Sequence, residues 1–361
     1  MSERMFIEGN EAIGWGATVA GCQAFFGYPI TPQNEITEWF AREFPKMGRI
    51  FVQTQSELGS INMLYGAAAT GIRAMTSSSS PGWSLMQETM SDMANAELPC
   101  VVIDVQRGGP GGGPIRHAQQ DYFQCTRGGG HGDYRNIVLA PASAQECCDL
   151  TQLAFYLADK YRNPVVIISD AIIGRLRETI EVKKIDFGPV PDKDWAVTGK
   201  GRHKDGKRRV MEHAGDLFAR YPSYQALLLN LDQKIKRMQK SELRYEGYKI
   251  EDAELILVAY GYTARVSKEA VNMARTEGIK AGLIRLITAW PFPYEVIRQK
   301  ASQGSRFLAV EDSLGQLVDD VRVAVESRAE VGLVNILDRH MPTDGGMILP
   351  DKILAKIETM K

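Results

Sequence analysis

The chain has 361 residues, of which 44% are hydrophobic and 24% charged, as expected of a soluble globular protein with room for two domains. Its 43 basic and 44 acidic side chains leave a formal net charge of −1, so there is no global electrostatic attraction for nucleic acid or for an anionic membrane. No apolar run has the length of a signal peptide or the roughly 20 residues that cross a bilayer, so we expect a cytoplasmic protein without membrane insertion.

Strand-like and helix-like segments alternate through the first half of the chain. Asn10 is expected to cap a helix that reaches Val19. A turn is expected at residues 77–81. Strands are expected at 24–28, 50–53, 73–76, 101–105, 137–139 and 164–169, and helices at 33–44, 60–70, 83–97 and 144–160. This alternation, with an almost wholly apolar strand at 101–105, predicts a doubly wound α/β domain.

The pattern changes after Gly174. Residues 183–209 are basic, are interrupted by prolines and lack periodicity, so we expect an irregular surface segment, followed by a long helix at 217–243. Alternation restarts at Glu254, with strands expected at 255–259, 282–286, 307–310 and 333–336, and helices around 266–270 and at 317–325. We therefore divide the chain into a first domain at 1–182, a linker at 183–250 and a second α/β domain at 251–361.

Polar side chains follow several of the expected strands. In Tyr28-Pro29-Ile30-Thr31-Pro32, two prolines restrict the backbone and present Thr31 at the carboxyl end of a strand, where open α/β sheets bind ligands. Glu57 follows the next strand, and Arg107 and Arg116 bracket a Gly-rich loop further on. Hydroxyl, carboxylate and guanidinium groups are therefore expected near one edge of the sheet.

The cysteines give no indication of a metal site in this chain. Cys22, Cys100, Cys125, Cys147 and Cys148 include no C-x-x-C pair, so neither zinc nor an iron–sulfur cluster is expected here. Cys125 lies near the Gly-rich loops, but no activating His or Asp stands at a suitable spacing, and a structural role is favoured.

Five spaced segments resemble a known family: residues 28–32, Glu57 with Asn62 and residues 66–68, then 76–82, 107–110 and 129–134. Together they are similar to the alpha-type, pyrimidine-domain subunit of 2-oxoacid:ferredoxin oxidoreductases. The likeness is closest to the branched-chain 2-oxoisovalerate type, with the 2-oxoglutarate type next. Residues 259–261, 285–293 and 310–312 also resemble the transketolase C-terminal-like domain of these enzymes, so the resemblance covers nearly the whole chain.

The resemblance implies a thiamine-diphosphate-binding pyrimidine-type domain followed by a transketolase C-terminal-like α/β domain. It also implies coenzyme-A-dependent oxidative decarboxylation of a 2-oxo acid to acyl-CoA and CO2, with reduction of ferredoxin. Two alternatives stay open: a thiamine-dependent dehydrogenase subunit of the lipoamide-linked type, and a non-catalytic scaffold subunit. The acyl specificity is not fixed by the sequence, because several loops shape such a pocket.

The resemblance also implies roles for particular residues. Glu57 would place its carboxyl group against N1′ of the cofactor's aminopyrimidine. Thr31 and Arg116 would act with it at the catalytic centre, where Arg116 offers a bidentate fork to the substrate carboxylate and Arg107 competes for that role. The expected cofactor-binding residues are Glu57, Pro29, Ser79, Ser80 and Gly82, and the expected substrate-binding residues are Thr31, Arg116 and Arg107.

Each of these roles has a simpler structural alternative. Glu57 could be a first-turn acidic residue that interacts with its helix dipole, and Thr31 could cap the following helix. Arg116 could pair with Asp121 on the surface. His131 is explained as well by a structural role, at a subunit contact, as by general-base chemistry.

The sequence also lacks part of what the implied chemistry needs. We find no Gly-Asp-Gly segment with a downstream Asn pair of the kind that binds diphosphate and Mg²⁺. A beta-type partner subunit is therefore expected to hold the diphosphate, Mg²⁺ and a [4Fe–4S] cluster. The family also implies a gamma-type subunit, in some members a ferredoxin-like delta subunit, and ferredoxin as electron acceptor. The isolated chain is expected to be inactive.

Overall fold

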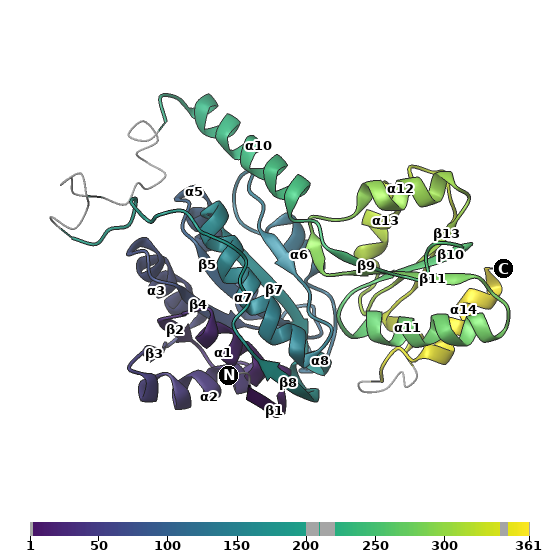
Figure 1. Cartoon of the computed structure of the whole chain (residues 1–361), viewed down its shortest axis with the longest axis horizontal. Coiled ribbons are helices and arrows are strands. Elements are labelled where there is room, and N and C mark those ends of the chain that lie inside the picture. Colours follow the sequence, from purple (N-terminus) through teal and green to yellow (C-terminus); the bar gives the residue numbers. More distant parts are fainter. Residues whose placement is uncertain (1–2, 200–208, 210–220, 340–345, 361) are drawn as a thin grey trace.

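The structure is a computed structural model that describes residues 3–199, 209, 221–339 and 346–360. Its described strands form a seven-stranded sheet in the first half of the chain, a five-stranded sheet in the second half, and a two-stranded pair. Figure 1 shows the two larger sheets as neighbouring α/β bodies, with a long helix, α10 (Tyr224–Ser241), lying above the first body. Within the described residues, no helix combines the length and apolar character needed to cross a bilayer.

The larger sheet has the strand order β12-β6-β7-β5-β4-β2-β3. Every neighbouring pair is parallel except β12 with β6. All residues of the central strands β5 and β7 are buried, as expected of strands covered by helices on both faces. Its strands are β2 (Ala24–Gly27), β3 (Ile50–Gln53), β4 (Ala74–Ser78), β5 (Cys100–Gln106), β6 (Ile137–Leu139), β7 (Pro164–Asp170) and β12 (Thr288–Trp290).

The helices of this body pack their apolar faces onto the sheet. Phe40 of α2, for example, stacks on Phe25 of β2 with ring centroids 4.1 Å apart. The helices are α1 (Gly9–Val19), α2 (Asn34–Glu43), α3 (Glu57–Ala69), α4 (Ser80–Leu85), α5 (Gln87–Asn95), α6 (Tyr122–Arg127), α7 (Ala144–Tyr161) and α8 (Ala171–Arg175), with a 3-10 turn at Pro45–Met47.

The smaller sheet has the order β14-β13-β10-β11-β9, in which only β9 is antiparallel. Its strands are β9 (Tyr245–Tyr248), β10 (Leu255–Ala259), β11 (Ala281–Leu286), β13 (Arg306–Val310) and β14 (Val331–Val334). Its helices are α11 (Gly261–Thr276), α12 (Tyr294–Ser302), α13 (Leu317–Val325) and α14 (Pro350–Thr359), with a 3-10 turn at Ile336–Asp338. The doubly wound α/β class predicted for the first domain and the α/β class predicted for the second domain are both confirmed.

Several local predictions are wrong in detail. Asn10 does not cap α1: the N-cap is Glu8, which forms a capping box with Glu11, while the buried Asn10 amide donates to Pro32 O at 3.0 Å and to Glu35 at 2.9 Å. The helix expected at 83–97 is divided into α4 and α5 at Met86. Of the helix expected at 217–243, residues 217–220 lie outside the described residues, and in the described part the helix runs over Tyr224–Ser241.

Long-range pairing adds elements that the sequence pattern did not indicate. Strand β1 (Glu3–Glu8) pairs antiparallel with β8 (Arg177–Val182). Strand β12, although it comes from the second half of the sequence, pairs with β6 at the edge of the first sheet.

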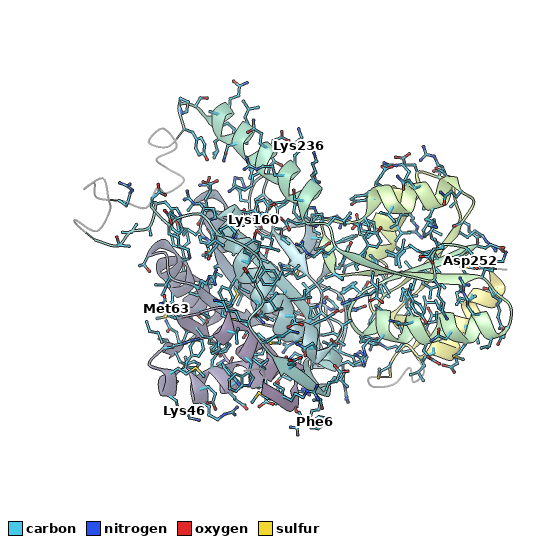
Figure 2. All side chains as sticks on the ribbon, viewed as in Figure 1. Phe6, Lys46, Met63, Lys160, Lys236 and Asp252 are labelled. Carbon is cyan, nitrogen blue, oxygen red and sulfur yellow. The ribbon has the colours of Figure 1, made fainter. Side chains whose placement is uncertain are left out.

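The segment from 183 to 199 has no helix or strand, as expected, and α10 follows it after the gap in the described residues. The C-terminal end of α10 is attached to α7, because Glu242, the C-cap of α10, accepts hydrogen bonds from Lys160 and Tyr161. Figure 2 shows Lys160 in the region just below α10, whereas the exposed Phe6 and Met63 lie at the outer edge of the first body.

Candidate active site

The predicted site lies where the order of strands in the first sheet reverses. After β2 the chain forms β3 on one side of it, and then returns to form β4 on the other side. The turn at residues 28–32 follows β2, and residues 79–82 follow β4. In open α/β sheets, ligands bind in the crevice at such a switch point, beyond the carboxyl ends of the strands.

The proline turn is held in place by Gln33 and Arg107. The Gln33 amide donates to Tyr28 O at 3.0 Å, and its Oε1 accepts from Ser77 and Thr37. Arg107 Nη1 donates to Thr31 O at 2.9 Å. The Thr31 hydroxyl has no hydrogen-bond partner among the described residues, and the N-cap of α2 is Gln33, so the capping alternative for Thr31 is not realised.

Glu57 is the first residue of α3 and is 7% exposed. Its side chain runs against α4, since a Cβ built on Gly82 would lie 2.6 Å from both Glu57 Oε1 and Cγ, and 2.1 Å from Ser78 Oγ. The Glu57 carboxylate accepts no hydrogen bond from the described part of the chain. Its first-turn position also satisfies the helix-dipole alternative, so the two interpretations of Glu57 coexist.

The two serines predicted to contact the cofactor differ in their hydrogen bonding. Ser80 N donates to Asp104 Oδ1 at 3.0 Å, and Ser80 Oγ donates to Asp121 while it accepts from Arg107 N at 2.9 Å. The Ser80 hydroxyl is therefore engaged by the protein. In contrast, the buried hydroxyls of Ser78 and Ser79 have no partner in the described residues, so their hydrogen-bonding capacity is unused.

Two buried carboxyl groups support this turn. Burial raises the pKa of Asp104 well above its usual range and raises that of Asp121 to about 6. Cys125 lies beside them, with its Sγ 3.8 Å from Asp104 Oδ2, and burial raises the pKa of its thiol. A thiol held in its protonated form is a poor nucleophile, which agrees with the structural role expected for Cys125.

The two arginines are placed differently. Arg107 is half-buried and donates to Thr31 O and, through Nη2 at 2.7 Å, to Gly112 O. Arg116 is exposed, and its backbone carbonyl accepts from Gly108 N at 3.0 Å. The alternative pair with Asp121 is not formed, because Asp121 is instead bonded to Ser80.

A cleft of about 890 Å³ opens on the Ser80 and Arg107 side of this region, and its lining residues do not include Glu57, Ser78 or Ser79. It is lined by Ser80, Arg107, Asp121, the Gly-rich loop and residues 314–316 of the second domain. Of the predicted site residues, Glu57 contacts Gly82, and Ser80 is linked through Arg107 to Thr31. Pro29 and Arg116 are exposed.

Sequence reasoning missed three contributors to this region. Gln33 could have been identified as the amide that directly follows the proline turn. Asp104, inside a strand that is otherwise almost entirely apolar, was also visible as a polar exception. Residues 314–316 carried no signal, since they reach the cleft only through tertiary packing.

The unbonded groups fit one half of thiamine diphosphate. An aminopyrimidine carries ring nitrogens and an amino group that can bond a carboxyl group and hydroxyls. Glu57, Ser78 and Ser79 offer such partners in a buried setting, and Gly82 keeps the space beside Glu57 open. The role of each residue toward the cofactor stays a prediction.

Comparisons with known proteins agree with this arrangement. Residues 15–207 match the family model described as pyruvate flavodoxin/ferredoxin oxidoreductase, thiamine diphosphate-binding, and residues 253–353 match pyruvate:ferredoxin oxidoreductase core domain II. The ketoisovalerate oxidoreductase subunit VorB of Methanothermobacter marburgensis is 49% identical over 97% of this chain and 96% of its own length. The 2-oxoglutarate synthase subunit KorA of the same organism is 39% identical over the full length of both chains.

Solved structures give the same assignment. The 2-oxoglutarate:ferredoxin oxidoreductase from Magnetococcus marinus, with 2-oxoglutarate, coenzyme A and succinyl-CoA bound, superposes with a TM-score of 0.82 at 27% identity. The match covers 99% of this chain but only 65% of that one. A split-gene transketolase, at 15% identity and a TM-score of 0.59, shares the fold. The chain therefore belongs to the 2-oxoacid:ferredoxin oxidoreductase family, as a subunit with a thiamine-diphosphate-binding domain and a core domain II, and it is more similar to the ketoisovalerate subunit than to the 2-oxoglutarate subunit.

Proposed function

We propose that this chain is the subunit of an oxidoreductase that converts a branched-chain 2-oxo acid and coenzyme A into acyl-CoA and CO2, with ferredoxin as the electron acceptor. The supporting observation is the buried Glu57 carboxylate, unbonded within the described protein, facing Gly82 beside two unbonded serine hydroxyls at the switch point. 2-Oxoglutarate is the second candidate substrate, supported by the matches to KorA and to the Magnetococcus marinus enzyme.

Thiamine diphosphate supplies, when bound, a nucleophilic carbon that allows a 2-oxo acid to lose CO2. Glu57 holds a hydrogen bond at N1′ of the aminopyrimidine, in a buried setting where that bond is strong. Gly82 leaves the space that the Glu57 side chain needs. Thr31 donates its hydroxyl to the substrate, and Arg107 and Arg116 orient the substrate carboxylate.

The remaining parts of the reaction centre belong to partner subunits. A beta-type subunit holds the diphosphate, Mg²⁺ and a [4Fe–4S] cluster, and gamma-type and ferredoxin-like delta subunits complete a cytoplasmic complex. Support comes from the missing diphosphate motif in this sequence and from the relatives, which are named as subunits. Coenzyme A as the acyl acceptor is supported by the Magnetococcus marinus enzyme, which was solved with coenzyme A and succinyl-CoA bound.

The defining experiment assays the complex purified with its partner subunits. Coenzyme-A-dependent viologen reduction is measured with a panel of branched-chain, linear and dicarboxylic 2-oxo acids. We expect the highest kcat/KM for a branched-chain acid, stoichiometric iron in the complex, and no turnover by the isolated chain. Robust activity of this chain alone would overturn the proposal that the active site is shared with a partner subunit. Lipoamide reduction by an iron-free complex would instead identify the lipoamide-linked alternative.

Glu57→Gln tests whether the site in this chain is catalytic. The amide preserves the shape of the side chain but removes the carboxyl group, and loss of a positioned proton-transfer group typically lowers turnover by about 10²–10⁴-fold. We therefore expect kcat to fall into that range while the complex assembles normally. Glu38→Gln, on the exposed face of α2, is the matched control and should retain full activity. Undiminished turnover by Glu57→Gln would favour the scaffold interpretation.

A further inference from the structure

The second domain has its own switch point, and it is filled by a side chain from the first domain. Strand β10 has β11 on one side and β13 on the other, so the crevice between the carboxyl ends of β10 and β13 is the place where such a sheet would bind a ligand. The fully buried Gln119, which precedes α6, lies there. The crevice is therefore closed from within the chain.

Gln119 is hydrogen-bonded almost completely. Its backbone N–H donates to Asp312 O at 2.8 Å, and its side-chain Oε1 accepts from Asp312 N at 3.0 Å and from the Thr263 hydroxyl at 3.1 Å. Its Nε2 donates to Tyr260 O at 3.0 Å. Gly261 makes room for this amide, since a Cβ there would lie 3.0 Å from Nε2.

A charged cluster beside Gln119 holds the same segment. His117 Nδ1 lies 2.8 Å from Asp312 Oδ2, and Arg339 donates to both Asp312 oxygens and to His117 O. Burial opposes ionisation of Asp312, but the bonds from His117 and Arg339 outweigh it and hold its pKa below the usual range. His117 also packs edge-on against Tyr262, with ring centroids 5.4 Å apart.

The segment held in this way forms one leg of the Gly-rich loop. Arg107 and His117 pair as an isolated antiparallel bridge at the base of the loop, and Gly108 N donates to Arg116 O. Between them, residues 110–116 are exposed and include three glycines. A loop with so few side chains to pack is held mainly by its base and by the bond from Arg107 Nη2 to Gly112 O.

We propose that the second domain acts as a clamp on the Gly-rich loop, with Gln119 as a positioning residue that sets where Arg107 and Arg116 meet the substrate carboxylate. The part of the proposal that concerns the substrate rests on the proposed function above. The clamp itself is a property of the chain and can be measured without turnover.

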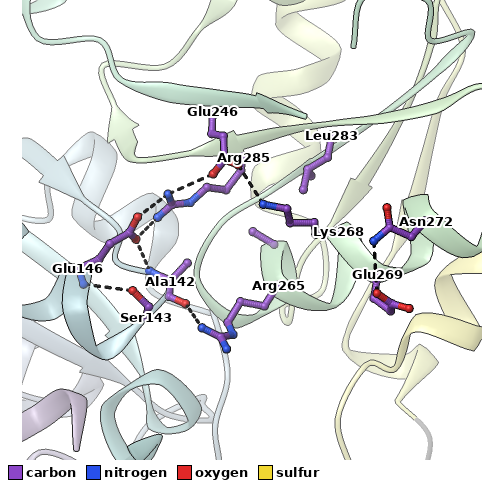
Figure 3. A pocket seen from close by; sticks show the side chains of 11 residues that line it. Ala142, Ser143, Glu146, Glu246, Arg265, Lys268, Glu269, Asn272, Leu283 and Arg285 are labelled. Carbon is purple, nitrogen blue, oxygen red and sulfur yellow. Dashed lines mark hydrogen bonds and ion pairs between the residues drawn. The ribbon is translucent and has the colours of Figure 1, made fainter. Parts of the chain in front are cut away.

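A second contact between the domains provides a matched control, because it touches neither the loop nor Gln119. This contact lines a cavity of about 390 Å³, where Arg265 of α11 donates to Ala142 O at 2.9 Å. Figure 3 shows Arg285 of β11 paired with Glu146 of α7 in the same cavity. Arg265 also bonds Glu178 at 3.0 Å and is largely exposed. Arg265→Gln therefore weakens the domain contact without removing a bond to Gln119 or to the Gly-rich loop.

The test compares Gln119→Leu, Thr263→Val and Arg265→Gln in the complete complex. Gln119→Leu removes the side-chain amide bonds at similar volume, and Thr263→Val removes a single hydroxyl, which is shared between Gln119 Oε1 and Tyr260 O. We expect Gln119→Leu to raise the KM for the 2-oxo acid by at least about tenfold with a much smaller change in kcat, because misplacement of binding groups by about 1 Å is enough for such losses. Amide hydrogen exchange over residues 107–120 should accelerate in the same variant. Thr263→Val should move both readouts in the same direction by less, and Arg265→Gln should move neither.

The outcomes separate the clamp from the proposed function. If Gln119→Leu fails to assemble, Thr263→Val decides, and unchanged KM and exchange in that variant would overturn the clamp. Equal effects of Gln119→Leu and Arg265→Gln would also overturn it, since they would reflect general loosening. If the wild-type complex oxidises no 2-oxo acid, the proposed function fails, while the exchange measurements still test the clamp.

Discussion

Replacing Gly82 by alanine tests the arrangement of the proposed cofactor site through a single methyl group. The new Cβ would lie 2.6 Å from Glu57 Oε1 and Cγ and 2.1 Å from Ser78 Oγ. Ordinary contacts with carbon begin near 3.4 Å, so the Glu57 side chain would have to retreat by roughly 1 Å, a misplacement that can cost about 100-fold in rate. We expect kcat/KM of the reconstituted complex to fall by about that factor, equivalent to about 2.7 kcal/mol of transition-state stabilisation.

The effect on folding should be smaller and can be measured separately. Overpacking costs about 1–3 kcal/mol, and the better helix propensity of alanine returns up to about 1 kcal/mol in α4. Gly66→Ala is the control, because Gly66 lies in α3 and a Cβ there meets nothing within 4 Å. This control should stabilise the chain slightly and leave turnover unchanged. A folded Gly82→Ala complex with kcat/KM within about threefold of wild type would refute the reasoning.

Two further predictions concern the arginines of the Gly-rich loop and a buried carboxyl group. Arg116→Gln should raise the KM for the 2-oxo acid about tenfold, and because the Arg116 side chain is exposed, the free energy of unfolding should change by no more than about 0.5 kcal/mol. Arg107→Gln should raise the KM and also destabilise the chain by about 1–3 kcal/mol, because it loses the bonds to Thr31 O and Gly112 O. A KM unchanged by Arg116→Gln would leave substrate binding to Arg107. Burial raises the pKa of Asp170 to about 6, so the folded state binds the Asp170 proton more tightly than the unfolded state does. The resulting contribution to folding stability is fully present below about pH 4 and is lost as the pH rises through 6. In urea unfolding, Asp170→Asn should flatten the fall in stability between about pH 4 and pH 6, and an unchanged slope would contradict this assignment.

The sequence predicted the parts of the fold that depend on local patterns. Strands β2, β3 and β5 lie where apolar runs end at turn residues, and the turn at 28–32 and Glu57 follow those strands as expected. The N-cap of α1 was assigned wrongly because Asn10 is a good capping residue by type, yet its amide is used by Pro32 O and Glu35 from another element. A local rule cannot weigh such a distant partner.

The clamp could not be predicted for the same physical reason. Gln119 and Asp312 are 193 residues apart, and although residues 310–312 carry part of the family resemblance, nothing in the sequence pairs Asp312 with Gln119. The hydrogen-bonding state of Ser78, Ser79 and Ser80 was equally hidden, because it depends on Asp104 and Asp121, which belong to a neighbouring strand and to a later loop. Hydrophobic periodicity reports which face of an element is buried, and not which polar groups meet there.

Strand β12 makes the two halves of this chain mutually dependent. Residues 288–290 supply the edge strand that covers β6, while the strands on either side of them in the sequence belong to the other sheet. A fragment cut near residue 250 would retain the residues predicted to bind the cofactor but expose the backbone donors and acceptors of β6, which favours aggregation by edge pairing. For gene fragments, domain exchanges between relatives or fusion proteins, the smallest useful unit is therefore the whole polypeptide, even though its two sheets look like separable modules.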